Sequence, residues 1–182
     1  MIPQTLATWT IDINHSLVQF KVKHLAISNV TGTFNTFTGN VQTDNDDFNE
    51  ARVHFEVAVN SIDTNNAERD SFLQSPAFFD IDKYPNMIFH GKMYKQQDDY
   101  ALNGELTIHG ITRPVQLNVE YTGTGKGRFG DTRAGFEVSG KINRKDFDLN
   151  FALLTETGSL VVGEEIKLHF DIQLMNSESN VI

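Results

Sequence analysis

Apolar and polar residues alternate along much of this chain. Val18, Phe20 and Val22 alternate with polar neighbours in the segment 17–24, and the same pattern runs through 52–60 and 161–175. Side chains of a β-strand point to opposite faces with a period of two, so each segment is expected to have one dry face and one wet face. Repeated along the chain, the pattern predicts an antiparallel sheet around a single apolar interior.

Eight segments carry strand signals and are separated mostly by short polar turns. They are Leu17–His24, Asn29–Val41, Arg52–Asn60, Asn86–Tyr94, Tyr100–His109, Arg113–Tyr121, Thr132–Asn143 and Val161–Met175. Short sequential connections favour an up-and-down meander, and closing the sheet into a barrel removes its exposed edges. The sequence therefore predicts a barrel, with a two-sheet sandwich as the alternative. Gly32 and Gly39 are expected to mark bulges or sharp coiling.

One connection differs from the others. Asn65 and Glu68 have the spacing of a capping box, and 67–75 can form about two helical turns before Pro76 ends them. This connection is also strongly apolar, because it contains Phe72, Leu73, Phe78 and Phe79. Such a connection must fold back on something, so we expect it to close one end of the barrel or one side of a pocket.

Length, charge and cysteine content narrow the function classes. The chain has 182 residues, and no linker-like tract interrupts it between Trp9 and Met175, which predicts one domain over 8–175 and a disordered tail over 176–182. The formal net charge of -9 argues against nucleic-acid binding and against electrostatic docking on an anionic membrane. The absence of cysteine excludes disulfides and thiolate chemistry.

The sequence also lacks recognisable targeting segments. Residues 1–9 have neither the basic nor the apolar region of a signal peptide, and no stretch approaches the roughly 20 apolar residues of a transmembrane helix. The chain as written is therefore expected to be cytoplasmic, or periplasmic if a leader has been removed.

The six histidines and the carboxylates form no catalytic or metal-binding motif. No two histidines have the close spacing typical of ligands from one element, so no metal site is predicted. By alternation, His54, His109 and His169 should face water, whereas His24 continues the inward face of the first strand. His24 is thus the one inward candidate for acid–base chemistry.

Four segments together give the chain a resemblance to the YceI-like family of bacterial lipid-binding proteins. They are 15–39 with its His-Ser start and spaced phenylalanines, 66–89 with Arg69-Asp70 and Phe78-Phe79-Asp80, 104–115 with the run GELTIHGITRPV, and 142–147 with the run INRKDF. The match extends over about 8–175. Asp148 follows Phe147 where the family often has glycine, which leaves the conformation of that turn open.

The resemblance implies an all-β fold, an eight-stranded antiparallel barrel of extended lipocalin type with a short helical insertion. It further implies a tunnel that holds an isoprenoid chain, a quinone tail or a fatty-acid-like molecule. It supplies no catalytic motif, no metal and no cofactor besides such a bound lipid. A homodimer is compatible with it.

Twelve apolar residues are candidate tunnel walls because they have inward parity or lie in the aromatic connection. They are Phe20, Val22, Phe34, Val57, Leu73, Phe78, Phe79, Phe89, Leu106, Phe136, Phe147 and Phe151. Arg69 and Arg144 are candidates for contacting a ligand head group. The alternative for both arginines is an ion pair with Asp70, Asp80 or Asp146 that holds the insertion in place.

Three functions remain open at this point. The first is a carrier, store or protector of an apolar lipid, for which no catalytic residue is needed. The second is an isomerase, cyclase or hydrolase that uses the same interior on an apolar substrate. The third is an interaction protein whose barrel is filled by its own side chains, since an eight-stranded barrel can be packed solid or can hold one small ligand.

Overall fold

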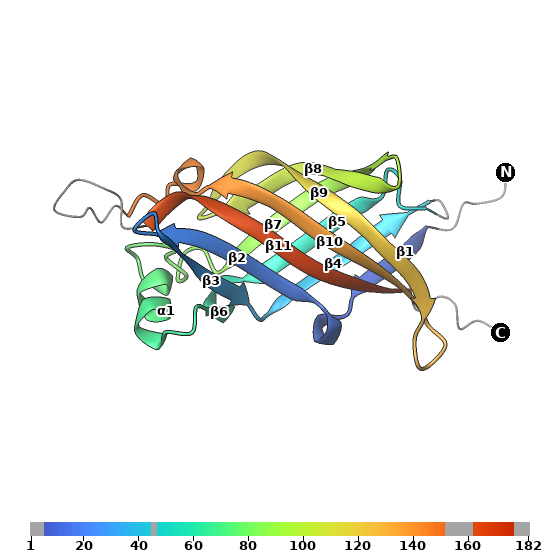
Figure 1. Cartoon of the computed structure of the whole chain (residues 1–182), viewed down its shortest axis with the longest axis horizontal. Coiled ribbons are helices and arrows are strands. Elements are labelled where there is room, and N and C mark those ends of the chain that lie inside the picture. The colour runs from blue at the N-terminus through green and yellow to red at the C-terminus, as the bar shows by residue number, and fades with distance from the viewer. Residues whose placement is uncertain (1–5, 45–46, 152–161, 177–182) are drawn as a thin grey trace.

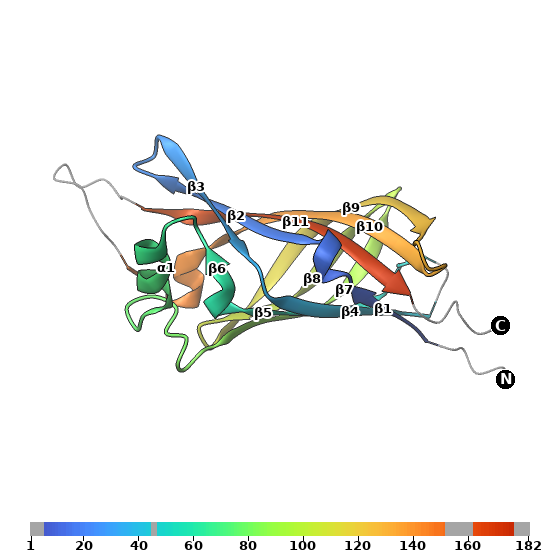
Figure 2. The same cartoon turned by 90° about the horizontal axis from the view of Figure 1, so that it is seen from below.

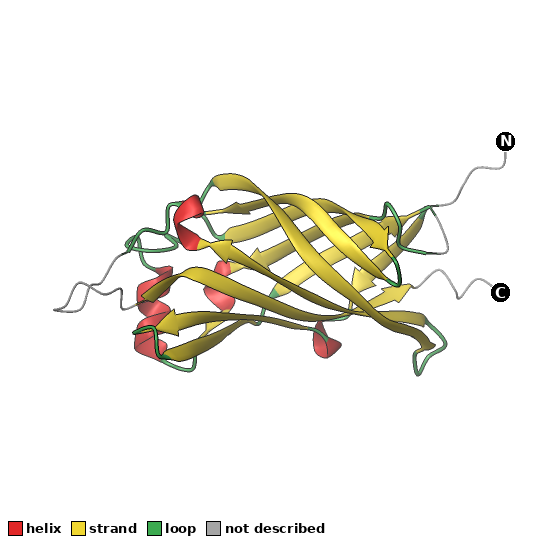
Figure 3. Cartoon of the chain, turned by 45° about the horizontal axis from the view of Figure 1, so that its top comes forward, coloured by secondary structure: helices red, strands yellow, loops and turns green. Residues whose placement is uncertain are grey.

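The computed structural model describes residues 6–44, 47–151 and 162–176. Its strands are β1 (Ala7–Ile11), β2 (Leu17–His24), β3 (Ser28–Phe34), β4 (Phe37–Thr43), β5 (Arg52–Ala58), β6 (Ile62–Asp63), β7 (Asn86–Gln96), β8 (Asp99–Ile108), β9 (Ile111–Lys126), β10 (Thr132–Asn143) and β11 (Val162–Asn176). The helical segments are α1 (Ala67–Gln74) and the short 3₁₀ turns η1 (Ile13–His15), η2 (Val59–Ser61) and η3 (Arg144–Phe147). Strands form the barrel wall and α1 lies at one end (Figure 3).

Eight antiparallel strands close into a barrel, which confirms the predicted fold class (Figure 1). The order around it is β1-β4-β5-β7-β8-β9-β10-β11, and pairing of β1 with β11 completes the circle. The edge of β11 is shared, because β2 pairs with it between Val162 and Asp171 and β1 pairs with it at Leu174 and Met175. The strands β2, β3 and β6 therefore extend the wall beyond the closed part.

The predicted strand 29–41 is two strands in the structure. β4 continues the barrel wall toward β5, whereas β3 pairs with β2 and, at its end, with the short β6. The break falls at Asn35 and Thr36, where the backbone N–H of Asn35 bonds to Ser61 instead of to a neighbouring strand. The opening between β3 and β5 is occupied by the connection that carries η2, β6 and α1 (Figure 2).

Gly32 and Gly39 do not form bulges. Both keep regular cross-strand register, Gly32 opposite Phe20 and Gly39 opposite Phe55. A Cβ on Gly32 would lie 2.3 Å from the ring of Phe20, so glycine is needed there to make room for an aromatic ring across the sheet. Shifts of register lie instead between Gly135 and Phe136, where β10 pairs with β9, and between Val162 and Ile166, where β11 pairs with β2.

Helix α1 begins at Ala67 as the sequence predicted, but its N-cap lies one residue later than the expected capping box. The N-cap is Asn66, whose side chain accepts the backbone N–H of Arg69 at 3.0 Å, while Asn65 takes a left-handed conformation with φ of 62°. None of the helices in the described part of the chain has the length and apolarity needed to cross a membrane.

The end of the barrel opposite α1 is filled by aromatic rings. Trp9 stacks on Phe48 at 5.2 Å between centroids, and Phe48 meets the ring of Phe136 edge-on at 5.0 Å. Tyr100 and Tyr121 also pack against Phe136, and all but Tyr121 are buried. We call Trp9, Phe48, Tyr100, Tyr121 and Phe136 the aromatic plug. It closes this end of the interior.

A buried ion pair secures the junction of β1 and β2 near the same end. The carboxylate of Asp12, only 8% exposed, accepts hydrogen bonds from Arg133 on β10 and from the Asn14 N–H, and lies 2.6 Å from Nδ1 of His15. Burial opposes ionisation of this carboxyl, but the hydrogen bonds from His15, Arg133 and Asn14 outweigh it and lower the pKa of Asp12.

Asp12→Asn is expected to lower the free energy of unfolding by about 2 kcal/mol at pH 7. Because the pKa of Asp12 is lower in the folded chain, its contribution is present above the unfolded pKa of about 4 and is lost as pH falls through the folded value. Urea titrations between pH 7 and pH 2 should show the wild type and the variant converging below about pH 4. Asp98→Asn, at an exposed turn, is the control, and an equal loss in both variants would contradict the assignment.

Candidate ligand cavity

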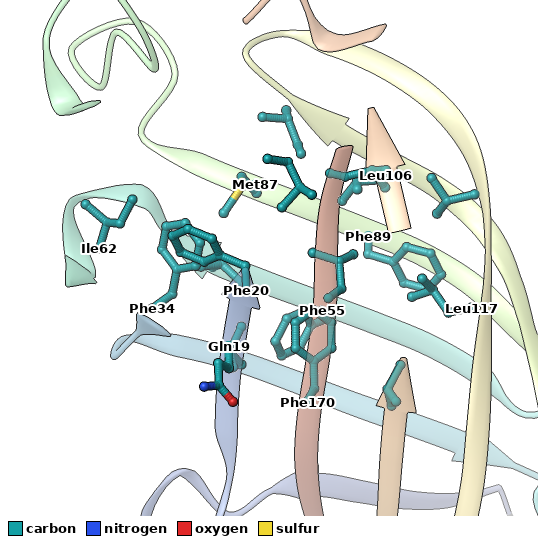
Figure 4. Close-up of a pocket in the computed structure, with 18 of the residues that line it drawn as sticks. Gln19, Phe20, Phe34, Phe55, Ile62, Met87, Phe89, Leu106, Leu117 and Phe170 are labelled. Carbon is teal, nitrogen blue, oxygen red and sulfur yellow. The ribbon is translucent and has the colours of Figure 1, made fainter. Parts of the chain in front are cut away.

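The barrel encloses an apolar cavity of about 410 Å³. This volume lies within the range of roughly 300–1,000 Å³ that small-molecule sites occupy in proteins. Side chains from opposite walls converge on it, with Phe89, Leu106 and Leu117 on one side and Phe20 and Phe34 on the other (Figure 4). The interior therefore contains an apolar cavity and is not filled by the aromatic side chains of the described residues.

The inward side chains near the middle of the barrel are only half-buried. Phe170 and Ile172 on β11, Phe55 on β5 and Leu106 on β8 all line the cavity and retain accessible surface. In a packed core, side chains at the centre of long strands are normally fully buried. Their residual exposure indicates apolar surface that no part of the described chain covers.

The cavity narrows at one level along its length. Phe55 and Phe170 come from strands that are not neighbours, yet their ring centroids lie 6.2 Å apart (Figure 4). Phe37 packs against Phe55 at 5.9 Å. Beyond this level the cavity continues toward Phe136, which belongs to both the lining and the aromatic plug.

The mouth of the cavity lies at the α1 end. Lys23 and Arg69 are the exposed residues among those that line the cavity in the described ranges, and both belong to elements at this end (Figure 1). Leu73, Phe78 and Phe79 from the helical connection cover part of the opening, as the sequence predicted. Phe79 packs edge-on against Phe34 at 6.5 Å, which ties this cover to β3.

Arg69 holds the start of the insertion through Thr64. Its Nε donates to the hydroxyl of Thr64 at 2.8 Å and its Nη2 donates to the Thr64 carbonyl at 2.7 Å. The carboxylate of Asp70 accepts the Thr64 backbone N–H at 3.0 Å. Arg69 thus holds the start of the insertion in place by bonding to the buried Thr64. The alternative considered from the sequence, an ion pair between Arg69 and an aspartate, is not found among the described residues.

Arg144 lies deeper and is only 2% exposed. Its guanidinium donates to the carbonyl oxygens of Leu149, Val162 and Gly163, the last at 2.9 Å from Nε. Burial lowers the pKa of Arg144, while the nearby carboxylate of Glu164 acts in the opposite direction. The expected ion pair to an aspartate is wrong for this residue, because backbone carbonyls satisfy its donors instead. One side of Arg144 still faces the cavity.

Ten of the twelve predicted wall residues line the cavity, as do both arginines. The ten are Phe20, Val22, Phe34, Val57, Leu73, Phe78, Phe79, Phe89, Leu106 and Phe136. Phe147 is not in the lining, because it is buried behind Arg144 in the packed cluster at the α1 end. Phe151 lies outside as well, 37% exposed and edge-on to Phe72 at 4.8 Å. Whether the lining residues touch a ligand stays a prediction.

Several lining residues were missed although the signal for them was present. Phe55, Leu168, Phe170 and Ile172 share the inward parity of the strands in which they lie. Ile11 belongs to β1, whose short alternation of Ala7, Trp9 and Ile11 with threonines was not read as a strand. Applying the two-residue period to every strand would have found them.

One histidine, His109, is not exposed to solvent as the sequence predicted. His54 lies on the outer face as predicted, where its Nδ1 is 3.1 Å from Nδ1 of His90 across β5 and β7. His109 is instead half-buried, with its Nδ1 3.3 Å from the carbonyl of Phe147 and its ring against Tyr84. Among the described residues, no three potential ligand side chains converge as a metal site would require.

Ionisable residues that line the cavity in the described ranges are all basic. They are Lys23, His24, Arg69 and Arg144, together with His54, whose ring pairs with His90 on the outer face. This bias stands out in a chain of formal net charge -9. The mouth, which holds Lys23, His24 and Arg69, therefore offers hydrogen-bond donors to whatever polar group lies there.

Sequence comparison places this chain among known proteins. The family model for the YceI-like domain matches residues 9–174. A UPF0312 protein of Photorhabdus laumondii is 41% identical over 145 residues, which cover 78% of this chain and 76% of that protein.

Two solved structures share the architecture. The Campylobacter jejuni YceI protein is 32% identical, with a TM-score of 0.70 over 85% of this chain and 90% of that one. A polyisoprenoid binding domain from Saccharophagus degradans, implicated in plant cell wall breakdown, is 17% identical, with a TM-score of 0.68 over 94% of this chain and 99% of that one. At this level of identity the second likeness concerns the fold alone.

Proposed function

This chain belongs to the YceI-like domain family, and from that membership together with its hollow barrel we propose that it binds a lipid with a long apolar chain and acts as its carrier, store or protector. The lipid is an isoprenoid, a quinone tail or an acyl chain. The observation that carries this proposal is the apolar cavity, whose half-buried walls match a hydrocarbon chain in chemistry.

Energetics favour reversible binding. Each methylene moved from water into an apolar site gains about 0.8 kcal/mol, so a long chain binds tightly relative to water. A lipid in a bilayer has already made that gain, and its transfer into the barrel is close to neutral in hydrophobic terms. The protein can therefore exchange a lipid with a membrane without an energy source.

The mouth favours a head group rich in hydrogen-bond acceptors. Lys23, His24 and Arg69 surround the opening, and no Asp or Glu lines the cavity within the described ranges. Carboxylate, phosphate and quinone oxygens all accept hydrogen bonds from such groups. The polyisoprenoid binding domain with the same fold supports an isoprenoid as the first ligand to test.

Mass spectrometry of an organic extract tests the proposal directly. Folded protein purified without detergent should release a lipid with a long apolar chain, and protein stripped of lipid should take up a polyprenol or quinone analogue. Repeated extracts without lipid, together with no uptake of either analogue, would count against lipid binding. Recovery of a loaded analogue with an altered mass would instead favour the enzymatic alternative, with His24 as the first residue to replace.

A further inference from the structure

The β2–β3 hairpin extends past the rim of the barrel at the α1 end (Figure 2). Its tip exposes apolar side chains to solvent, with Leu25 40% exposed and Ile27 82% exposed. Among the large hydrophobic side chains of the described residues, only Phe129 is equally exposed, and it lies in the β9–β10 turn at the opposite end of the barrel (Figure 1). Single exposed apolar residues are common, so exposure by itself does not assign a role.

The backbone at the tip of the hairpin has an unusual conformation. Leu25 and Ala26 both have positive φ, 53° and 58°. His24 pairs with Ser28, so residues 25–27 form a three-residue loop whose first two residues are left-handed. Asn and Gly adopt this conformation readily, and a leucine there adds backbone strain. Leu25 remains 40% exposed, so packing offsets this strain only in part. The tip therefore carries apolar side chains at positions where the isolated fold favours polar residues or glycine.

The tip of the hairpin lies next to the cavity. Val22 and His24 on β2 and Val30 on β3 line the cavity just below the tip, so the tip lies next to the mouth. On the α1 side, Phe72 is 37% exposed and pairs with the equally exposed Phe151. Apolar groups thus flank the opening on two sides, the hairpin and α1 (Figure 2).

We infer that the tip formed by residues 25–27 inserts into the surface of a lipid bilayer and places the mouth of the cavity against it. This inference rests on the proposed function, because a lipid carrier must receive its cargo from a membrane. The net charge of -9 argues against attraction to anionic lipids, so insertion of apolar side chains supplies the attachment. Contact of the mouth with the bilayer lets a hydrocarbon chain enter along β2 and β3 without crossing water.

Flotation with phosphatidylcholine vesicles measures the docking itself. Ile27→Asp is expected to reduce the vesicle-bound fraction at least about tenfold, because it replaces an inserted side chain with a charge. Phe129→Asp is the matched control, since Phe129 has the same 82% exposure at the other end of the barrel, and it should bind vesicles like the wild type. A further variant, Leu25→Asn with Ala26→Gly, should raise the midpoint of urea unfolding and still lose vesicle binding.

Transfer kinetics separate this inference from lipid binding as such. A fluorescent polyprenol analogue is offered to lipid-free protein either in vesicles or from an ethanol stock without vesicles. Ile27→Asp should slow uptake from vesicles about tenfold and leave uptake from the stock unchanged. Equal vesicle binding and equal transfer by wild type, Ile27→Asp and Phe129→Asp would overturn the inference while leaving lipid binding intact.

The remaining outcomes are also decisive. Failure of the wild type to take up the polyprenol analogue in either form counts against a polyprenol as the ligand, and failure with the quinone analogue as well refutes the proposed function. Flotation still reports on docking in either case. A loss of binding in Phe129→Asp as large as in Ile27→Asp would mean that any added charge repels the vesicles, and would overturn the inference. Conversion of a dimer to a monomer by Ile27→Asp, with no vesicle binding by the wild type, would assign the tip to a second copy of the chain.

Discussion

Leu106→Trp is expected to weaken binding of a polyprenol or quinone analogue at least about 100-fold while the barrel stays folded. Leu106 projects into the cavity from near the end of β8 and is only half-buried, so the larger indole can occupy the space that a ligand chain needs (Figure 4). Enlarging a side chain in a fully packed core costs about 1–3 kcal/mol or more, but an empty cavity accepts it at less than about 1 kcal/mol.

The measurement combines ligand titration with urea unfolding. Glu105→Trp is the matched control, because the neighbouring residue on the same strand is exposed on the outer face and should change neither affinity nor stability. Destabilisation of Leu106→Trp by more than about 3 kcal/mol would show that the interior is filled, as in the third function considered from the sequence. Full affinity in a stable variant would place the ligand elsewhere.

Arg144→Met is expected to lower the free energy of unfolding by about 3–5 kcal/mol. The guanidinium is buried and donates to the carbonyls of Leu149, Val162 and Gly163, all of which lose a charged donor in the variant. These carbonyls come from chain segments on either side of residues 152–161, so Arg144 fixes the start of β11 to the end of η3. Arg144→Lys should recover only part of the loss, because an ammonium lacks the planar fork of the guanidinium.

Lys145→Met provides the comparison for a charge on the surface. Lys145 pairs with Glu164 at 2.7 Å, but both side chains are substantially exposed, and its loss should cost no more than about 1 kcal/mol. Urea unfolding at neutral pH ranks the three variants. Similar stability of Arg144→Met and Lys145→Met would show that the buried carbonyl contacts of Arg144 contribute little.

The period of two identified the barrel because it reports a local property. Whether a side chain faces inward is fixed by its neighbours on the strand, and all eight predicted strands occur in the closed wall or its extension. The break at Asn35 and Thr36 was missed because both parts alternate, and only long-range pairing of β3 with β6 separates them. An inward position in the alternation also does not say whether the side chain packs in a core or lines a cavity. Only the tertiary structure decides between the two.

The arginines illustrate a second limit of the sequence. Arg144 lies next to Asp146 in the chain, and proximity suggested an ion pair. Its partners are carbonyls of residues 149, 162 and 163, and backbone groups leave no mark in the sequence. Phe151 was assigned to the wall for its apolar character, yet it lies outside the barrel against Phe72. Composition identified the residue types of the site, and tertiary structure assigned their roles.

Because the aromatic plug fills one end, the described part of the barrel opens at the α1 end. On the proposed function, a hydrocarbon that enters past Lys23 and Arg69 would advance tail first past Phe55 and Phe170 toward Phe136, and would leave in the reverse direction. The length of the cavity between the mouth and Phe136 is set by the hydrogen-bonded strands of the wall and does not adjust to the ligand. On the proposed function, longer chains would leave their excess outside and shorter ones would leave a void beneath them, so we expect the barrel to select its ligand by chain length.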